Sequence, residues 1–239
     1  MSDAVDATPP PADPNEPQES KAVKLVNWIV KQAIGGAKVL KPAGALADEY
    51  LTSEKHKTPA EQIDALVKWS RLQNFTTGFA TGVWGFAALP VTLPAGMASS
   101  LVIQARMAAA IAKIAGHDIE SPAVQTFVTM TLLGGNVAKL VKAAGLQEAA
   151  KSLSKSMMAQ VPAKVLMELN KQIGLQLLAK AGTAGLAGLA KFIPLVGGVV
   201  GGSVDQLFCR QVGKAAKEIF FDGHLPDDTD PDGETPPAE

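Results

Sequence analysis

Residues 72–105 read LQNFTTGFATGVWGFAALPVTLPAGMASSLVIQA, and none of these 34 residues carries a charge. An apolar stretch of this length is long enough to cross a bilayer. However, Pro90 and Pro94 divide it, and several glycines interrupt it. Because proline ends helices, we expect two helices, about 75–89 and 95–115, joined by a turn.

Three interpretations of this predicted hairpin stay open. It is the buried centre of an all-helical soluble domain, a shallow or re-entrant membrane insertion, or a true membrane span. Proline and glycine count against a lipid-exposed span, because the backbone groups that they free need polar partners. The sequence favours the buried centre.

A second stretch, 182–204, has the same character, with glycines before Pro194 and Gly-Gly pairs after it. Glycines spaced by three or four residues allow two helix backbones to approach closely. The phosphate-binding pattern G-x-x-x-x-G-K-[ST] is absent, and no predicted strand precedes a G-x-G-x-x-G run. The glycine clusters therefore predict helix packing and not nucleotide binding.

The rest of the chain also favours helices, and no run alternates as a strand does. Thr58-Pro59-Ala60-Glu61 is typical of a helix start, with Thr58 and Glu61 placed to cap each other. We therefore predict an all-α fold in a single domain. The other expected helices are 21–40, 43–51, 122–144 (weakened at Gly134-Gly135), 146–159, 162–181 and 194–221.

The net charge of −1 conceals an uneven distribution. Residues 1–20 contain five acidic and no basic residues, and residues 222–239 contain seven acidic ones. All 22 basic residues therefore lie in 21–221 with the remaining 11 acidic ones, a net charge of +11. We expect two disordered acidic tails around a basic domain. A basic domain favours an anionic partner, although lysines that merely solvate helix faces are the alternative.

The first predicted helix, 21–40, has an amphipathic pattern. Lys24, Lys31 and Lys38 recur every seven residues and share one face. Trp28 lies about 40° from Lys24 around the helix. A tryptophan beside a lysine row is typical of a helix that lies on a membrane surface. The alternative is a tryptophan packed on lysine stems or on a neighbouring helix.

Two charges stand alone in apolar surroundings. Burying a charge is costly unless it is paired, so Arg106 and Asp205 are expected to face each other or a shared polar ligand. The alternative is that both lie near helix ends and reach water. Lys113 and Lys191 could complete the polar rim of an apolar groove. The glycines and prolines expected to line that groove are Gly78, Gly82, Gly85, Pro90, Pro94, Pro194, Gly197 and Gly201.

The sequence offers little for catalysis. A single cysteine and three histidines exclude a disulfide scaffold and give no metal cluster, so no metal or cofactor is expected. Cys209 is predicted to be an inert buried thiol. His117-Asp118 is expected to turn the chain and cap a helix. The pattern G-x-S-x-G is absent, and three scattered arginines give no nucleic-acid signature.

Two runs carry a family resemblance. One reads GFATGVWGFAALP over residues 78–90 and is followed by GHD at 116–118; the other reads KFIPLVGG over residues 191–198. Over about 58–221 the chain resembles the EcsC family, in which an aromatic residue is expected where this chain has His117. The resemblance implies a bacterial cytoplasmic or peripheral-membrane protein near envelope or transport functions, because the family is named after an operon that encodes an ABC transporter. It implies no catalytic residue.

We therefore predict a non-enzymatic helical module that binds an anionic membrane surface or a lipid-like ligand. An accessory partner of an ABC transporter is the first alternative, and a lipid-acting hydrolase or transferase is a minor one. The N-terminus lacks a basic segment followed by an apolar run, so we expect no secretory signal. We expect a cytoplasmic protein, peripheral on the inner face of the cell membrane.

Overall fold

A computed structural model describes residues 15–36, 40–84, 95–134, 137–143, 153–189 and 208–226. This part of the chain is helical and contains no strand, which confirms the predicted all-α class in a single helical domain. The helices are α1 (Gln18–Gly35), α2 (Ala43–Leu51), α3 (Pro59–Trp84), α4 (Ala95–Ile114), α5 (Pro122–Thr131), α6 (Val137–Ala143), α7 (Lys155–Ala159) and α8 (Ala163–Leu189). Residues 208–217 are also helical and continue into a π-helix, η2 (Glu218–Asp222).

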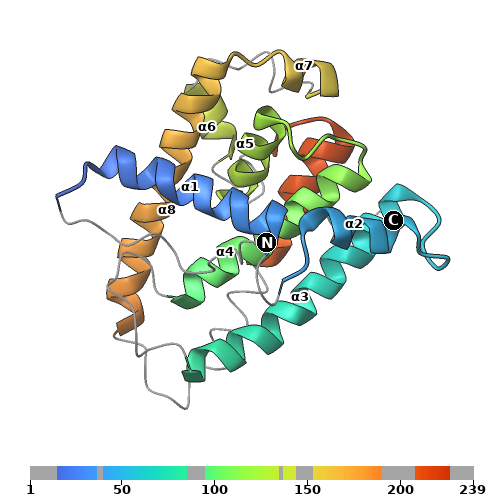
Figure 1. Cartoon of the computed structure of the whole chain (residues 1–239), viewed down its shortest axis with the longest axis horizontal. Coiled ribbons are helices and arrows are strands. Elements are labelled where there is room, and N and C mark those ends of the chain that lie inside the picture. Colours follow the sequence, from blue (N-terminus) through green and yellow to red (C-terminus); the bar gives the residue numbers. More distant parts are fainter. Residues whose placement is uncertain are drawn as a thin grey trace, which may run out of the picture.

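Helix α4 is the centre of the fold (Figure 1). It packs against α1, α2, α3 and α5, and residues 101–112 are all buried. A predominantly apolar helix such as this one is stable in water only when other helices surround it. Residues 101–105, the end of the uncharged stretch, therefore lie in the core of the domain, whereas residues 85–94 lie outside the described part.

Helix α3 differs from the expectation of a separate helix at 75–89. It runs unbroken from Pro59 to Trp84, because a helix interior tolerates glycine but not proline. Its predicted start is confirmed: Glu61 N donates to Thr58 Oγ1 over 3.3 Å, and Thr58 N donates to Glu61 Oε2 over 3.2 Å. The next helix begins at Ala95, as the sequence predicts.

Helices α1 and α8 lie against each other (Figure 1). At their closest approach, a Cβ atom added to Gly174 would lie 2.8 Å from the Ala22 Cα and nearer still to the Ala22 carbonyl group. Only glycine allows this contact between backbones. Helix α1 ends at Gly35, before the predicted residue 40, because Gly36 adopts a φ of +81° and turns the chain.

The predicted helix 122–144 is interrupted near its two glycines. Helix α5 ends at Thr131, and α6 begins at Val137. Gly134 adopts a φ of +60°, which disfavours other residues. Lys180 Nζ of α8 donates to the Leu133 carbonyl oxygen over 3.0 Å, so a side chain stabilises the chain after α5.

Helix α7 covers only the end of the predicted helix 146–159, whose residues 146–152 lie outside the described part. Helix α8 extends the predicted helix 162–181 to Leu189. Among the described helices, none combines the length and the apolar character that crossing a membrane requires.

Candidate functional site at the end of helix α4

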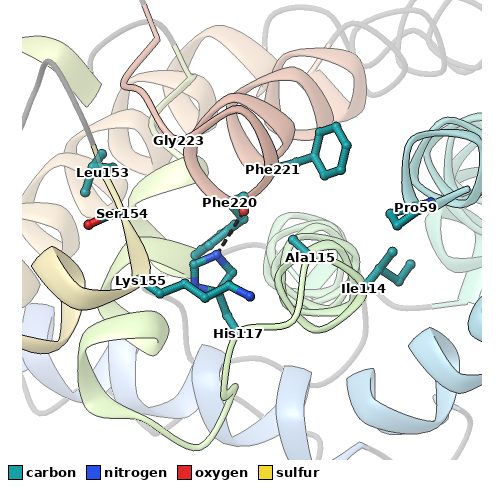
Figure 2. Close-up of a pocket in the computed structure, with 10 residues that line it drawn as sticks. All are labelled: Pro59, Ile114, Ala115, His117, Leu153, Ser154, Lys155, Phe220, Phe221 and Gly223. Carbon is teal, nitrogen blue, oxygen red and sulfur yellow. Dashed lines mark hydrogen bonds between the residues drawn. The ribbon is translucent and has the colours of Figure 1, made fainter.

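A pocket of about 300 Å³ lies where the end of α4, the start of α7 and the π-helix η2 meet (Figure 2). The start of α3 closes one side. Most of the lining residues are apolar, and His117, Ser154 and Lys155 are the polar ones. The lining residues are Pro59, Ile114, Ala115, His117, Leu153, Ser154, Lys155, Phe220, Phe221 and Gly223.

The end of α4 brings His117 to this pocket. Gly116 adopts a φ of +81°, its N–H donates to Lys113 O over 2.8 Å, and His117 N donates to Ala112 O over 2.9 Å. This pair of bonds around a left-handed glycine is the Schellman motif, a common way to satisfy the last carbonyls of a helix. The reversal turns the histidine ring back toward η2.

His117 is buried, with 8% of its surface exposed. Its Nε2 atom lies 2.9 Å from the Phe220 carbonyl oxygen, and the two rings meet edge to face with centroids 5.3 Å apart. Figure 2 shows this bond as a dashed line. Because a carbonyl oxygen only accepts, Nε2 carries the proton, and Nδ1 is the basic atom of the neutral ring.

Like α4, the π-helix ends at a glycine with a positive φ. Gly223 has a φ of +75°, and His224 N donates to Glu218 O over 3.0 Å. The Gly223 carbonyl oxygen then accepts from Leu153 N over 2.6 Å. These bonds fix the segment before α7 against η2. Short π-helical turns such as η2 often occur at functional sites.

Lys155 places a positive charge beside the histidine. A Cβ atom on Gly116 would lie 2.7 Å from Lys155 Nζ, so the ammonium group sits directly over the end of α4. A cation is favoured there by the partial negative charge of a helix C-terminus. The Lys155 side chain remains exposed, and its charge is therefore available to a ligand.

Burial lowers the pKa of His117, because an imidazolium ion loses hydration in the pocket. The bond to Phe220 O opposes this effect, and the charge of Lys155 adds to it. The pKa of His117 thus lies below its ordinary value of 6.5. Near neutral pH, the site holds a neutral imidazole beside one lysine cation.

The predicted rim residues on α4 lie elsewhere and face α2. Arg106 Nη1 donates to Lys41 O over 3.3 Å. Two turns further along the same face, Lys113 Nζ lies 2.8 Å from Asp48 Oδ1 and donates to Gly44 O over 3.2 Å. Both side chains therefore hold α2 on α4 instead of bordering the His117 pocket. Burial lowers the pKa of Arg106, and nearby Glu49 opposes that effect.

The predicted membrane-facing residues of α1 separate into two groups. Lys24 and Lys31 are exposed, and Lys24 Nζ forms an ion pair with Glu16 Oε1 at 2.7 Å. Trp28 is half-buried and packs against the core. Its position fits the alternative in which the tryptophan packs on a neighbouring helix.

The described part of the chain does not test the predicted roles of several residues. Gly78 and Gly82 lie within α3. The predicted pairing of Arg106 with Asp205 is not visible, because Asp205 is outside the described residues. The others outside it are Lys38, Gly85, Pro90, Pro94, Lys191, Pro194, Gly197 and Gly201.

Sequence reasoning did not find the pocket itself. It assigned His117 to a turn, which is correct for the backbone, but it missed the ring's contact with Phe220 and the nearby Lys155. The one signal present was a histidine at a position where the family resemblance leads us to expect an aromatic ring. Cys209 is buried, with its Sγ 3.9 Å from Met107 Sδ, as predicted for an inert thiol.

The described residues contain no group of three or more histidine, cysteine or acidic side chains that could hold a metal ion. A comparison with protein families matches residues 16–221 to the EcsC protein family. The chain belongs to the EcsC family. Searches of curated proteins and of solved structures gave no significant match. The family match begins before α1, so this EcsC domain extends beyond the 58–221 region that the sequence motifs indicated.

Proposed function

We propose that this EcsC-family protein is a non-enzymatic module that binds an amphipathic anion, meaning a carboxylate or phosphate attached to a short apolar chain. The observation that carries the proposal is the pocket of Figure 2, which combines an apolar wall with the exposed cation of Lys155. Its volume of about 300 Å³ is at the lower end of the range typical of ligand pockets.

The two parts of such a ligand would have distinct partners. Phe220, Phe221 and Ile114 offer apolar surface to the chain, and Phe221 is 40% exposed although it is a large apolar residue. Lys155 Nζ would pair with the anionic group. Neutral His117 adds no opposing charge, and its Nδ1 could accept a hydrogen bond from a protonated acid or a water molecule.

Binding is favoured over catalysis because the Ser154 hydroxyl group and the Nε2–H of His117 are already engaged. Ser154 Oγ accepts from Met157 N over 3.3 Å and lies 2.9 Å from Ser156 Oγ. Its role is to cap α7. The Nε2–H of His117 is held by Phe220 O. A serine nucleophile requires a base that faces its hydroxyl group, and these contacts give Ser154 a structural role instead.

The same ligand chemistry is available from a free amphiphile or from an anionic bilayer. Exposed Lys24 and Lys31 would add electrostatic attraction to a bilayer on the inner face of a bacterial membrane. Each such lysine contributes about 1 kcal/mol near an anionic surface, and salt screens this attraction. Flotation with anionic vesicles that high salt abolishes would indicate the bilayer as the source.

The deciding experiment titrates the full chain with octanoate and octyl phosphate by calorimetry, and with phosphatidylglycerol vesicles by flotation. Lys155→Met should weaken binding of the soluble amphiphiles about tenfold or more, because it removes a charged partner and keeps the apolar stem. Lys164→Met is the matched control, since Lys164 is exposed on α8 and does not line the pocket. Equal affinity of both variants for octanoate would refute the proposal.

A further inference from the structure

A second and larger cleft lies between α1, α5 and α8, with a volume of about 540 Å³. Val26, Val30 and Ile34 of α1 form an apolar wall. None of its lining residues borders the His117 pocket. The cleft is therefore a separate site, and its chemistry has to be derived from its own side chains.

Opposite charges line this cleft without meeting. Lys31 projects from α1, and Glu120 lies just before α5. Both are exposed, and within the described part neither side chain forms an ion pair with the other or with any third residue. Other lysines of the domain do find acidic partners, for example Lys217 with Asp64 at 2.7 Å. The cleft keeps one cation and one anion available to a molecule between them.

A third polar group in the cleft lacks a partner. The amide oxygen of Asn170 is buried, and no described residue donates a hydrogen bond to it. Its neighbours differ: Gln125 Nε2 donates to Ile119 O over 3.2 Å, and Thr126 Oγ1 donates to Pro122 O over 3.0 Å. A buried acceptor without a donor costs about 1–3 kcal/mol. Because this oxygen has less than 1 Å² of exposed surface, a ligand in the cleft does not reach it, and the ligand contacts come from the charged and apolar side chains of the wall.

We propose that the α1–α5–α8 cleft binds a small zwitterion that carries a compact apolar group. Lys31 pairs with the anionic group of the ligand. The ammonium group of the ligand faces Glu120. The apolar group packs on Val30 and Ile34. An apolar amino acid offers all of this chemistry, and the headgroup of a zwitterionic lipid offers its two charges. This site goes beyond the amphiphile pocket and does not depend on it.

The test uses calorimetric titration of the full chain with L-leucine and with phosphoethanolamine. Two controls keep the leucine skeleton and lack one charge: 3-methylbutylamine lacks the carboxylate, and 4-methylpentanoate lacks the ammonium group. At least one zwitterion should bind about tenfold more tightly than either control, because each lost charge leaves a protein charge without its partner. Leucine binding alone indicates an amino acid, and phosphoethanolamine binding alone indicates a headgroup.

Substitutions then assign the binding to this cleft. Lys31→Gln and Glu120→Gln should each weaken binding of the zwitterion about tenfold. The double variant Lys31→Glu/Glu120→Lys exchanges the two charges, so it should restore the affinity, with the ligand bound in the opposite orientation. Lys24→Gln, on the same helix but outside the cleft, and Lys155→Met, in the other pocket, should leave it unchanged. Thermal melting confirms that each variant folds. No binding of either zwitterion, equal binding of the one-charge controls, or an unaltered affinity after Lys31→Gln would overturn the proposal.

Discussion

The Nε2 atom of His117 lies 2.9 Å from the Phe220 carbonyl oxygen and joins the end of α4 to the π-helix η2 across 103 residues of sequence. The ring also packs edge to face on the Phe220 side chain. One residue thus supplies both an aromatic contact and a hydrogen-bond donor. The central helix and the last described helical segment are held together at the wall of the proposed amphiphile pocket.

Substitution of His117 should separate its two contributions to stability. In His117→Phe the edge-to-face contact persists, but the Phe220 carbonyl loses its donor, so we expect a loss of about 1–3 kcal/mol in the free energy of unfolding. In His117→Ala the cavity adds to this loss, for a total of about 3–5 kcal/mol. Urea unfolding measures both values. Equal stability of wild type and His117→Phe would show that the bond to Phe220 contributes nothing.

The lowered pKa of His117 makes stability depend on pH. Because the folded pKa lies below 6.5, the unfolded chain binds the proton more tightly than the folded chain does. The contribution of neutral His117 is fully present above about pH 6.5 and is lost as the pH falls from there through the folded pKa. Between roughly pH 7 and pH 5, the wild type should lose more stability than His117→Phe. Parallel pH profiles of the two proteins would contradict this expectation.

The crossing of α1 and α8 should be highly sensitive to one methyl group. Gly174→Ala places a Cβ atom against the backbone of Ala22, so the helices must separate, and we expect a loss of about 1–3 kcal/mol or more. Gly35→Ala is the control, because a Cβ atom there meets nothing within 4 Å. It should raise stability by up to about 1 kcal/mol. Calorimetric melting compares them, and similar melting temperatures would argue against the close crossing.

The two basic residues between α4 and α2 should differ in importance. Arg106 is 6% exposed, and Arg106→Ala leaves a cavity and removes the donor to Lys41 O, at a cost of about 2–5 kcal/mol. Lys113 and Asp48 form an ion pair whose side chains are 33% and 58% exposed. Lys113→Met should therefore cost only about 0–1 kcal/mol. Chemical denaturation tests this order, and an unchanged midpoint for Arg106→Ala would remove Arg106 from the set of structurally important residues.

Local patterns predicted much of the secondary structure. The capping residues Thr58 and Glu61 fixed the start of α3, and the proline-rich turn fixed the start of α4. Glycine was harder to interpret, because its effect depends on its surroundings. Gly78 and Gly82 lie inside a continuous helix, whereas Gly36 and Gly134 adopt a positive φ and end or interrupt one.

The amino-acid sequence by itself determined the helical class, the family and the basic character of the domain, because these follow from composition and from short-range pattern. Only the tertiary structure decided which side chains meet. Arg106 and Lys113 contact the region of α2. Lys155 lies over Gly116 at the end of α4, and Lys31 and Glu120 line the same cleft. The physical reason is that a helical period assigns a residue to a face of its own helix, whereas its partner on that face depends on how the helices cross.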